Sequence, residues 1–178
     1  MLQVVNSLMT SRKNIFKLRL INALLFAVLI YVQYNSVFTL NIAQANPMLA
    51  LALLVTVCMF CSEMTAAISG LIVGIFIDCV SMAPQGFNAI LLMILGLLTS
   101  LIIRHLFNNN IFSAVALCAL CTATYFFLRW VFCLAFSSSF TENITYLMQT
   151  AFPSVIYTAV LAIPFYYLEK LLYNKFYK

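Results

Sequence analysis

The sequence predicts an all-α integral membrane protein with a single transmembrane domain over residues 1–178. Of its 178 residues, 65% are hydrophobic and only 7% are charged, which is too little polar surface for a water-soluble globule. The apolar runs are separated by short polar turns, and several reach the roughly 20 residues that an α-helix needs to cross a bilayer. These observations predict six transmembrane helices with short loops, and such loops leave no room for a soluble catalytic domain.

The first span is expected at residues 20–40. A basic segment, residues 12–19, precedes this apolar run. The run is too long for the core of a signal peptide, and no small-residue cleavage site follows it, so we expect it to remain as a membrane anchor.

The next apolar block, residues 47–80, is too long for one span. A single helix of about 34 residues would be roughly 50 Å long, whereas the hydrocarbon core is about 30 Å thick. Ser62 can cap a new helix, and Glu63 would then lie in the first turn, where an acidic side chain is favourable. We therefore expect two spans, 47–61 and 64–80, of which the first is too short to cross without local thinning of the bilayer or burial in protein.

Three further spans complete the prediction. A turn at Pro84 and Gly86 separates the third span from the fourth, which is expected at 87–103. The fifth and sixth spans are expected at 111–136 and 144–168, on either side of a polar loop.

The basic residues predict the orientation of the chain. With six spans, eight of the nine Lys and Arg residues fall on one side, which the positive-inside rule makes the cytoplasmic side. Both termini are then cytoplasmic, and the net charge of +5 is a topology signal rather than a nucleic-acid-binding surface. The eight residues are Arg12, Lys13, Lys17, Arg19, Arg104, Lys170, Lys175 and Lys178.

Two formal charges fall inside apolar spans, Asp78 in the third and Arg129 in the fifth. A charge at such depth is costly unless it is paired or faces the interior of a helix bundle. Each lies about 8 to 10 Å from the outer end of its helix, because an α-helix rises about 1.5 Å per residue. We therefore predict an intramembrane charge pair between Asp78 and Arg129. The alternative is that Arg129 reaches the outer phosphates while Asp78 caps a helix or hydrogen-bonds locally.

Gly70 and Gly74 form a flat strip on the third span. Small residues four apart let another helix approach closely within a membrane. The strip is predicted either to pack against the fourth or first span of this chain or to receive the helix of a partner protein.

The sequence offers no catalytic, metal or cofactor site. No nucleophile triad, phosphate-binding glycine loop or pair of carboxylates can be assembled from it. The pairs Cys58 with Cys61 and Cys118 with Cys121 have a spacing seen in metal sites, but no histidine lies nearby in the sequence, and buried packing is the favoured interpretation. We therefore expect a protein that is not an enzyme.

A proline, Pro47, opens the second span, and in the third span Gly70 and Gly74 are followed by Asp78 and then by the turn at residues 84–86. Together with the six spans and short loops, this pattern resembles the MreD family of rod shape-determining proteins. The resemblance implies a non-enzymatic, multi-pass component of the bacterial cytoplasmic (inner) membrane that takes part in cell elongation. It also implies association with MreC and, indirectly, with MreB, RodA and a penicillin-binding transpeptidase, through which peptidoglycan synthesis would be regulated. The residues that carry the resemblance are Pro47, Gly70, Gly74, Asp78, Pro84 and Gly86.

The alternative function is the substrate-binding membrane subunit of an energy-coupling-factor vitamin transporter, whose fold the six-span pattern also resembles. In such subunits a small-residue motif on the first span contacts the coupling partner, and Ala23 and Ala27 are similar to it. A vitamin pocket would also need convergent polar groups, and apart from Asp78, Arg129 and a few hydroxyls the spans offer few.

Overall fold

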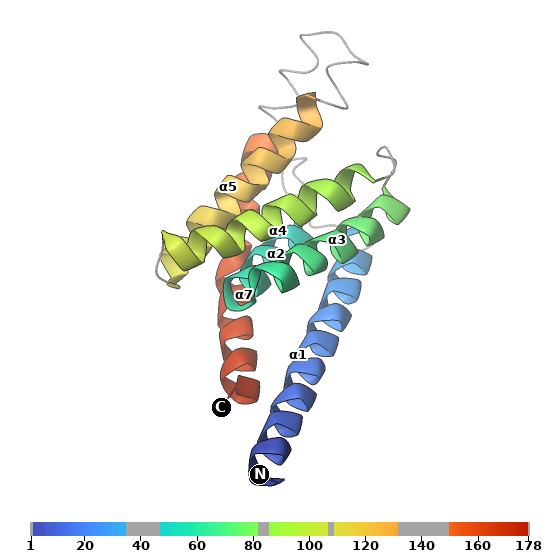
Figure 1. Ribbon diagram of the computed structural model, residues 1–178. Helices are drawn as coiled ribbons and strands as arrows, with labels where there is room; N and C mark the ends of the chain where they lie inside the picture. Colours follow the sequence, from blue (N-terminus) through green and yellow to red (C-terminus); the bar gives the residue numbers. More distant parts are fainter. Residues whose placement is uncertain (1, 35–46, 82–85, 107–108, 132–149, 178) are drawn as a thin grey trace.

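The computed structural model describes residues 2–34, 47–81, 86–106, 109–131 and 150–177. Six α-helices make up these segments, and Figure 1 shows them packed into one bundle. Within the described residues the protein is therefore all-helical. The helices are α1 (Leu2–Tyr34), α2 (Leu49–Phe60), α3 (Glu63–Val80), α4 (Phe87–His105), α5 (Ile111–Arg129) and α7 (Phe152–Tyr177).

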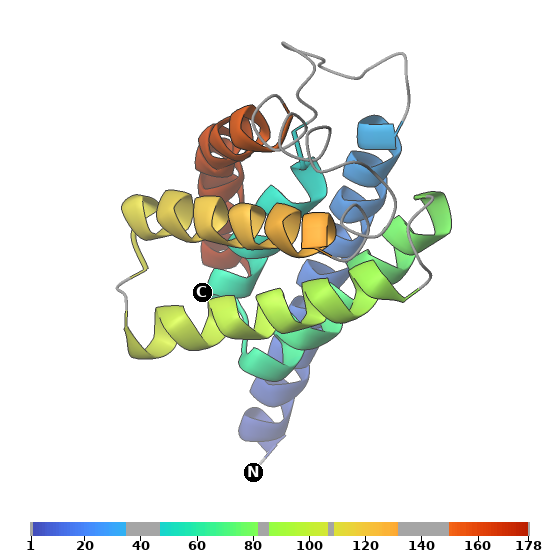
Figure 2. The same ribbon diagram turned by 90° about the horizontal axis from the view of Figure 1, so that it is seen from above.

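Helix α2 is the short apolar helix that the sequence predicts at 47–61. Five described helices are long and apolar enough to cross a membrane, whereas α2 has only 12 residues and is about 18 Å long. Every residue from Leu49 to Met59 is buried, and α2 lies at the centre of the bundle when it is seen from above (Figure 2). The structure therefore shows burial in protein for this short apolar helix.

Helices α3 and α4 form an antiparallel hairpin and make the most extensive helix pairing in the structure (Figure 1). Glycines on both helices permit the close approach. A Cβ atom added to Gly70 would collide with the carbonyl of Leu92, and one added to Gly96 would lie 2.8 Å from the carbonyl oxygen of Ala66. The strip of Gly70 and Gly74 is thus covered by α4 of the same chain.

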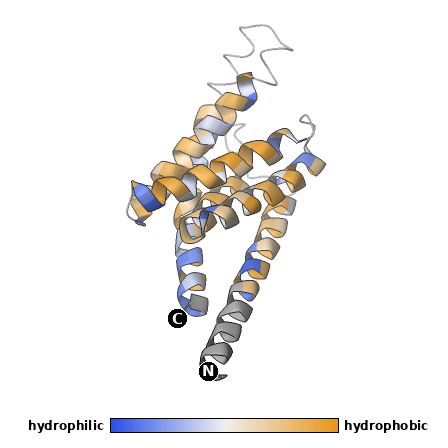
Figure 3. Cartoon of the chain, in the orientation of Figure 1, coloured by the Kyte–Doolittle hydropathy of each residue, from blue (hydrophilic) through white to orange (hydrophobic). Residues whose placement is uncertain are grey.

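Two helices extend further than the predicted spans. Helix α1 begins at Leu2, since residues 2–19 contain neither glycine nor proline and nothing in them stops a helix. Helix α7 continues to Tyr177, beyond the expected end at residue 168. The two termini consequently lie at the same end of the molecule (Figure 1), which we call the terminal end, and the last described turns of α7 carry hydrophilic residues among apolar ones (Figure 3).

Some predicted boundaries fall outside the described residues. These are the end of the first span at residue 40, the end of the fifth at 136, the start of the sixth at 144, and Pro84 in the turn between α3 and α4. Gly86 is described, and its φ of 88° is a left-handed conformation that glycine adopts without strain.

We predict that Gly74→Ala destabilises the protein by about 1 to 3 kcal/mol, because the added methyl group would meet the backbone of Asn88 and Ala89. Intrinsic helix propensity favours alanine by about 1 kcal/mol, so a loss of stability would report the packing alone. Thermal unfolding in detergent measures the change. The control Val80→Ile adds one carbon to an exposed side chain of the same helix and should have little effect. An unchanged or raised Tm for Gly74→Ala would contradict the close packing.

Candidate functional site

Asp78, near the end of α3, holds the start of α4. Its Oδ2 accepts hydrogen bonds from the backbone N–H groups of Gly86 (3.1 Å) and Ala89 (3.0 Å), and its Oδ1 accepts from the backbone N–H of Asn88 (3.2 Å). These N–H groups belong to the first turn of α4 and have no partner within the helix. The carboxylate therefore satisfies the first turn of α4 and lies where the helix dipole favours a negative charge.

Asn88 extends this contact to a third helix. Its amide Nδ2 donates to Asp78 Oδ1 at 2.8 Å, and its Oδ1 accepts a hydrogen bond of 2.7 Å from the hydroxyl of Tyr125 on α5. Both Asn88 and Tyr125 are buried. Asp78, Asn88 and Tyr125, here called the Asp78 network, thus connect α3, α4 and α5 by side-chain hydrogen bonds.

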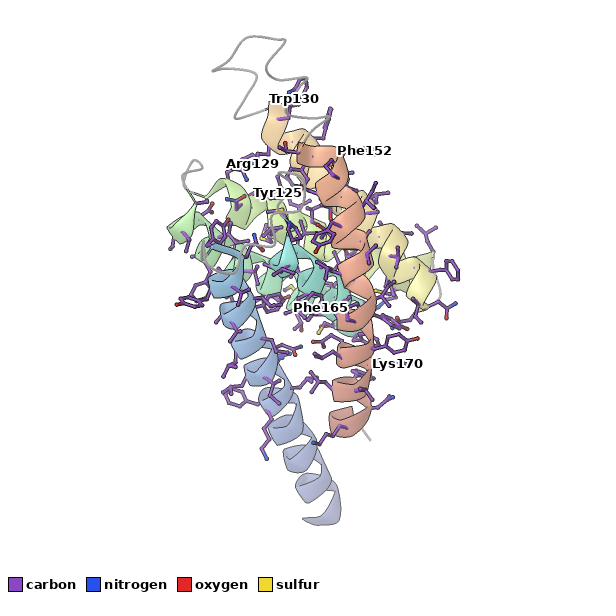
Figure 4. The ribbon with its side chains drawn as sticks, turned by 180° about the vertical axis from the view of Figure 1, so that it is seen from behind. Tyr125, Arg129, Trp130, Phe152, Phe165 and Lys170 are labelled. Atoms are coloured by element: carbon purple, nitrogen blue, oxygen red, sulfur yellow. The ribbon has the colours of Figure 1, made fainter. Side chains whose placement is uncertain are left out.

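Arg129 lies one turn beyond Tyr125 on α5, and both are labelled near one end of that helix in Figure 4. Asp78 lies near the end of α3 and Arg129 in the last turn of α5, and α5 ends on the side of the bundle opposite the terminal end (Figure 1). The local hydrogen bonding considered for Asp78 is present in the structure. A direct pair between Asp78 and Arg129 stays a prediction.

At the terminal end the same hairpin is joined by an ion pair. Arg104, in the last turn of α4, lies 3.0 Å from the carboxylate of Glu63 in the first turn of α3. Each charge also complements the dipole of its own helix. The α3–α4 hairpin is therefore fastened near both ends by charged groups.

A second buried polar contact joins α1 to α7. The Nδ2 of Asn22 donates to Oε2 of Glu169 at 3.3 Å, and only 7% of Asn22 and 2% of Glu169 are exposed. The remaining oxygens, Asn22 Oδ1 and Glu169 Oε1, have no hydrogen-bond partner among the described residues. Glu169 comes just after the expected end of the last span at residue 168, and the continuation of α7 brings it into the bundle.

A groove of about 480 Å³ lies between α1 and α3. Its lining is largely apolar and includes Ala23 and Ala27, with Asn22 and Arg19 near the terminal end. Arg19 also donates a hydrogen bond of 3.3 Å to the hydroxyl of Thr65 on α3. This surface, here called the α1–α3 groove, is a candidate binding site.

The cysteine pairs make contacts typical of packed thiols. Cys58 Sγ donates to the carbonyl of Ala66 at 3.9 Å, and Cys118 Sγ donates to the carbonyl of Thr158 at 3.6 Å. Across the described segments, no three or more His, Cys, Asp or Glu side chains gather where they could hold a metal ion.

Sequence reasoning found Asp78 and Arg129 but missed Asn88, Tyr125 and the contact of Asn22 with Glu169. The available signal for Asn88 was its position two residues after Gly86, as a lone amide in an apolar helix. For Tyr125 it was the spacing of four residues before Arg129, which puts both on one face of a helix.

These features define a class: a multi-pass helical membrane protein whose described buried polar groups mainly join one helix to another. The chain matches the family described as rod shape-determining protein MreD over residues 13–176 of its 178 residues. It therefore belongs to the MreD family and is a rod shape-determining membrane protein. No significant match was found among curated proteins or among solved structures, so the likeness to vitamin-transporter subunits stays a prediction.

We predict that Tyr125→Phe lowers stability by about 1 to 3 kcal/mol, because it leaves the buried Oδ1 of Asn88 without its donor. Asp78→Ala should cost more, since it removes the acceptor of four hydrogen bonds. Thermal unfolding in detergent compares the two. The control Phe127→Leu alters an exposed side chain of α5 and should change Tm little. Equal Tm values for Tyr125→Phe and the unaltered protein would contradict the network.

The predicted pair of Asp78 and Arg129 can be tested by a double-mutant cycle of Asp78→Asn and Arg129→Gln. Charge reversal is unsuitable, because an arginine at position 78 could not accept the bonds that Asp78 accepts from α4. If the two charges interact, the double variant should be more stable than the sum of the single losses by about 0.5 kcal/mol or more. Strict additivity of the unfolding free energies would count against the pair, and Arg129→Lys serves as the charge-preserving control.

Proposed function

We propose that this protein is a non-enzymatic component of the bacterial cell-elongation machinery that supports rod shape and regulates peptidoglycan synthesis through association with MreC. Through MreC it would act together with MreB, RodA and a penicillin-binding transpeptidase. The observation that carries the proposal is the family match, which extends over residues 13–176 and so covers nearly the whole chain.

The proposed location is the bacterial cytoplasmic membrane, with both termini in the cytoplasm. Basic side chains support this orientation. Arg19 and Arg104 contact Thr65 and Glu63 at the start of α3, and Lys170 lies on the part of α7 that runs toward the C-terminus (Figure 4). Positive charge gathers on the cytoplasmic side of membrane proteins. Arg129, at the opposite end, would then lie in the outer leaflet.

The architecture suits a role in holding other membrane helices in place. The α3–α4 hairpin is fixed by glycine packing and by charged contacts near both ends, and the central helix α2 is covered on all sides by protein. Because α4 covers Gly70 and Gly74, a partner helix would bind elsewhere, on apolar side chains that face outward. The span of MreC is the proposed partner for such a face.

Affinity purification tests this proposal. The protein is tagged at its C-terminus, native membranes are solubilised gently, and the co-purifying proteins are identified by mass spectrometry against a tagged, unrelated multi-pass protein. We expect MreC to be enriched, together with RodA or the transpeptidase. Enrichment of paired ATPases and a coupling subunit, without MreC, would contradict the proposal and indicate a transporter subunit.

A complementation assay tests whether the Asp78 network matters for this function. Asp78→Ala should still insert into the membrane but should fail to restore rod shape to cells depleted of the protein, because the start of α4 loses its cap. Asp78→Asn keeps one acceptor oxygen and should restore shape in part. Full rescue by Asp78→Ala at normal expression would show that shape determination does not need this carboxylate.

A further inference from the structure

The α1–α3 groove opens beside exposed apolar side chains, as a lipid-facing groove would. Leu24 and Val28 of α1 and Ile72 of α3 are exposed next to it, and these would contact acyl chains in a bilayer. The groove itself is lined mainly by apolar and small side chains, including Ala23, Ala27 and others. An occupant of its middle part must therefore be apolar.

One end of the groove is polar and carries a positive charge. The guanidinium of Arg19 is exposed there and donates a hydrogen bond to the neutral hydroxyl of Thr65. Asn22 lies one turn along α1 and also lines the groove, and its Oδ1 is buried without a donor. The guanidinium of Arg19 can pair with an anion. The Oδ1 of Asn22 can accept a hydrogen bond from a hydroxyl or another donor that lies within about one helical turn of that anion.

The volume of the groove, about 480 Å³, can be compared with that of one acyl chain. A single extended file of carbons about 4 Å across and about 20 Å long needs roughly 250 Å³. The groove therefore has room for one acyl chain.

We propose that the α1–α3 groove binds one molecule of an anionic phospholipid with a hydroxylated headgroup, of the phosphatidylglycerol type, from the leaflet at the terminal end. One acyl chain lies along Ala23 and Ala27, the phosphate pairs with Arg19, and a headgroup hydroxyl donates to Asn22 Oδ1. Basic pockets between transmembrane helices are a general way in which proteins hold anionic headgroups. The lipid would fill the space that separates α1 from α3 and so support the position of α1.

Lipid binding by the isolated protein does not depend on the proposed protein partners. The leaflet at the terminal end is the cytoplasmic leaflet if the orientation given under the proposed function holds. The test is native mass spectrometry of the purified full-length protein in neutral detergent. Phosphatidylglycerol, phosphatidylethanolamine and phosphatidylcholine with identical acyl chains are added in pairwise competition. We expect one tightly held phosphatidylglycerol, preferred over phosphatidylcholine by about fivefold or more, which is what one basic side chain near an anionic headgroup contributes.

Two pairs of variants separate the headgroup from the acyl chain. Arg19→Ala should abolish the preference for phosphatidylglycerol, whereas Lys175→Ala removes the same charge from an exposed position at the same end and should keep it. Ala27→Leu should reduce binding of all three lipids by filling the groove, whereas Ala116→Leu makes the same change on the outside of α5 and should not. Arg19→Gln is a second neutral variant that keeps a hydrogen-bond donor, should Arg19→Ala fail to fold.

Three outcomes would overturn the proposal. The first is equal loss of preference in Arg19→Ala and Lys175→Ala, which would mean that only the general surface charge attracts the lipid. The second is equal binding of phosphatidylethanolamine and phosphatidylglycerol, which would remove the requirement for an anion. The third is unchanged lipid binding in Ala27→Leu together with loss of a co-purifying single-span protein, which would make the groove a protein-binding surface. Loss of lipid binding with partners retained would leave the proposed function intact.

Discussion

The carboxylate of Asp78 is the group on which the arrangement of α3, α4 and α5 depends. A lone charge in an apolar helix is unfavourable, and here the start of α4 supplies the N–H donors that offset it. The same hydrogen bonds determine where α4 begins. The start of α4 in turn positions Asn88 to accept a hydrogen bond from the hydroxyl of Tyr125. One intramembrane charge therefore sets the geometry of three helices at the end opposite the termini.

Close contact between the backbones of α3 and α4 holds the rest of the hairpin together. Within a bilayer there is little hydrophobic drive for helices to associate, so packing and hydrogen bonds have to hold them together. Gly70, Gly74 and Gly96 provide that packing, and the pair of Glu63 and Arg104 secures the other end. Among the described residues, α1 packs against α3 much less extensively than α4 does. The space left between them is the α1–α3 groove, so the groove follows from the way the hairpin is built.

The sequence predicted some parts of the structure better than others, and the reasons are physical. The break between α2 and α3 was located within two residues, because Ser62 and Glu63 are local signals for the start of a helix. The full extent of α1 and α7 was missed, since hydropathy reports where a helix enters lipid and not where it ends. Asn22 and Glu169 lie 147 residues apart, and no local pattern relates them.

By itself the sequence determined the class of the protein, the approximate positions of its apolar helices, the asymmetry of its basic residues and its membership of a family. The first three follow from composition and short-range pattern, because the bilayer imposes helix length and hydrophobicity directly on the chain, whereas the family follows from the match over residues 13–176. Only the tertiary structure decided that α2 is enclosed by protein, that α4 covers the glycine strip and that a groove remains between α1 and α3. Those features depend on which helix faces meet, and many pairings of apolar faces are nearly equal in energy until particular small residues and buried polar groups select one.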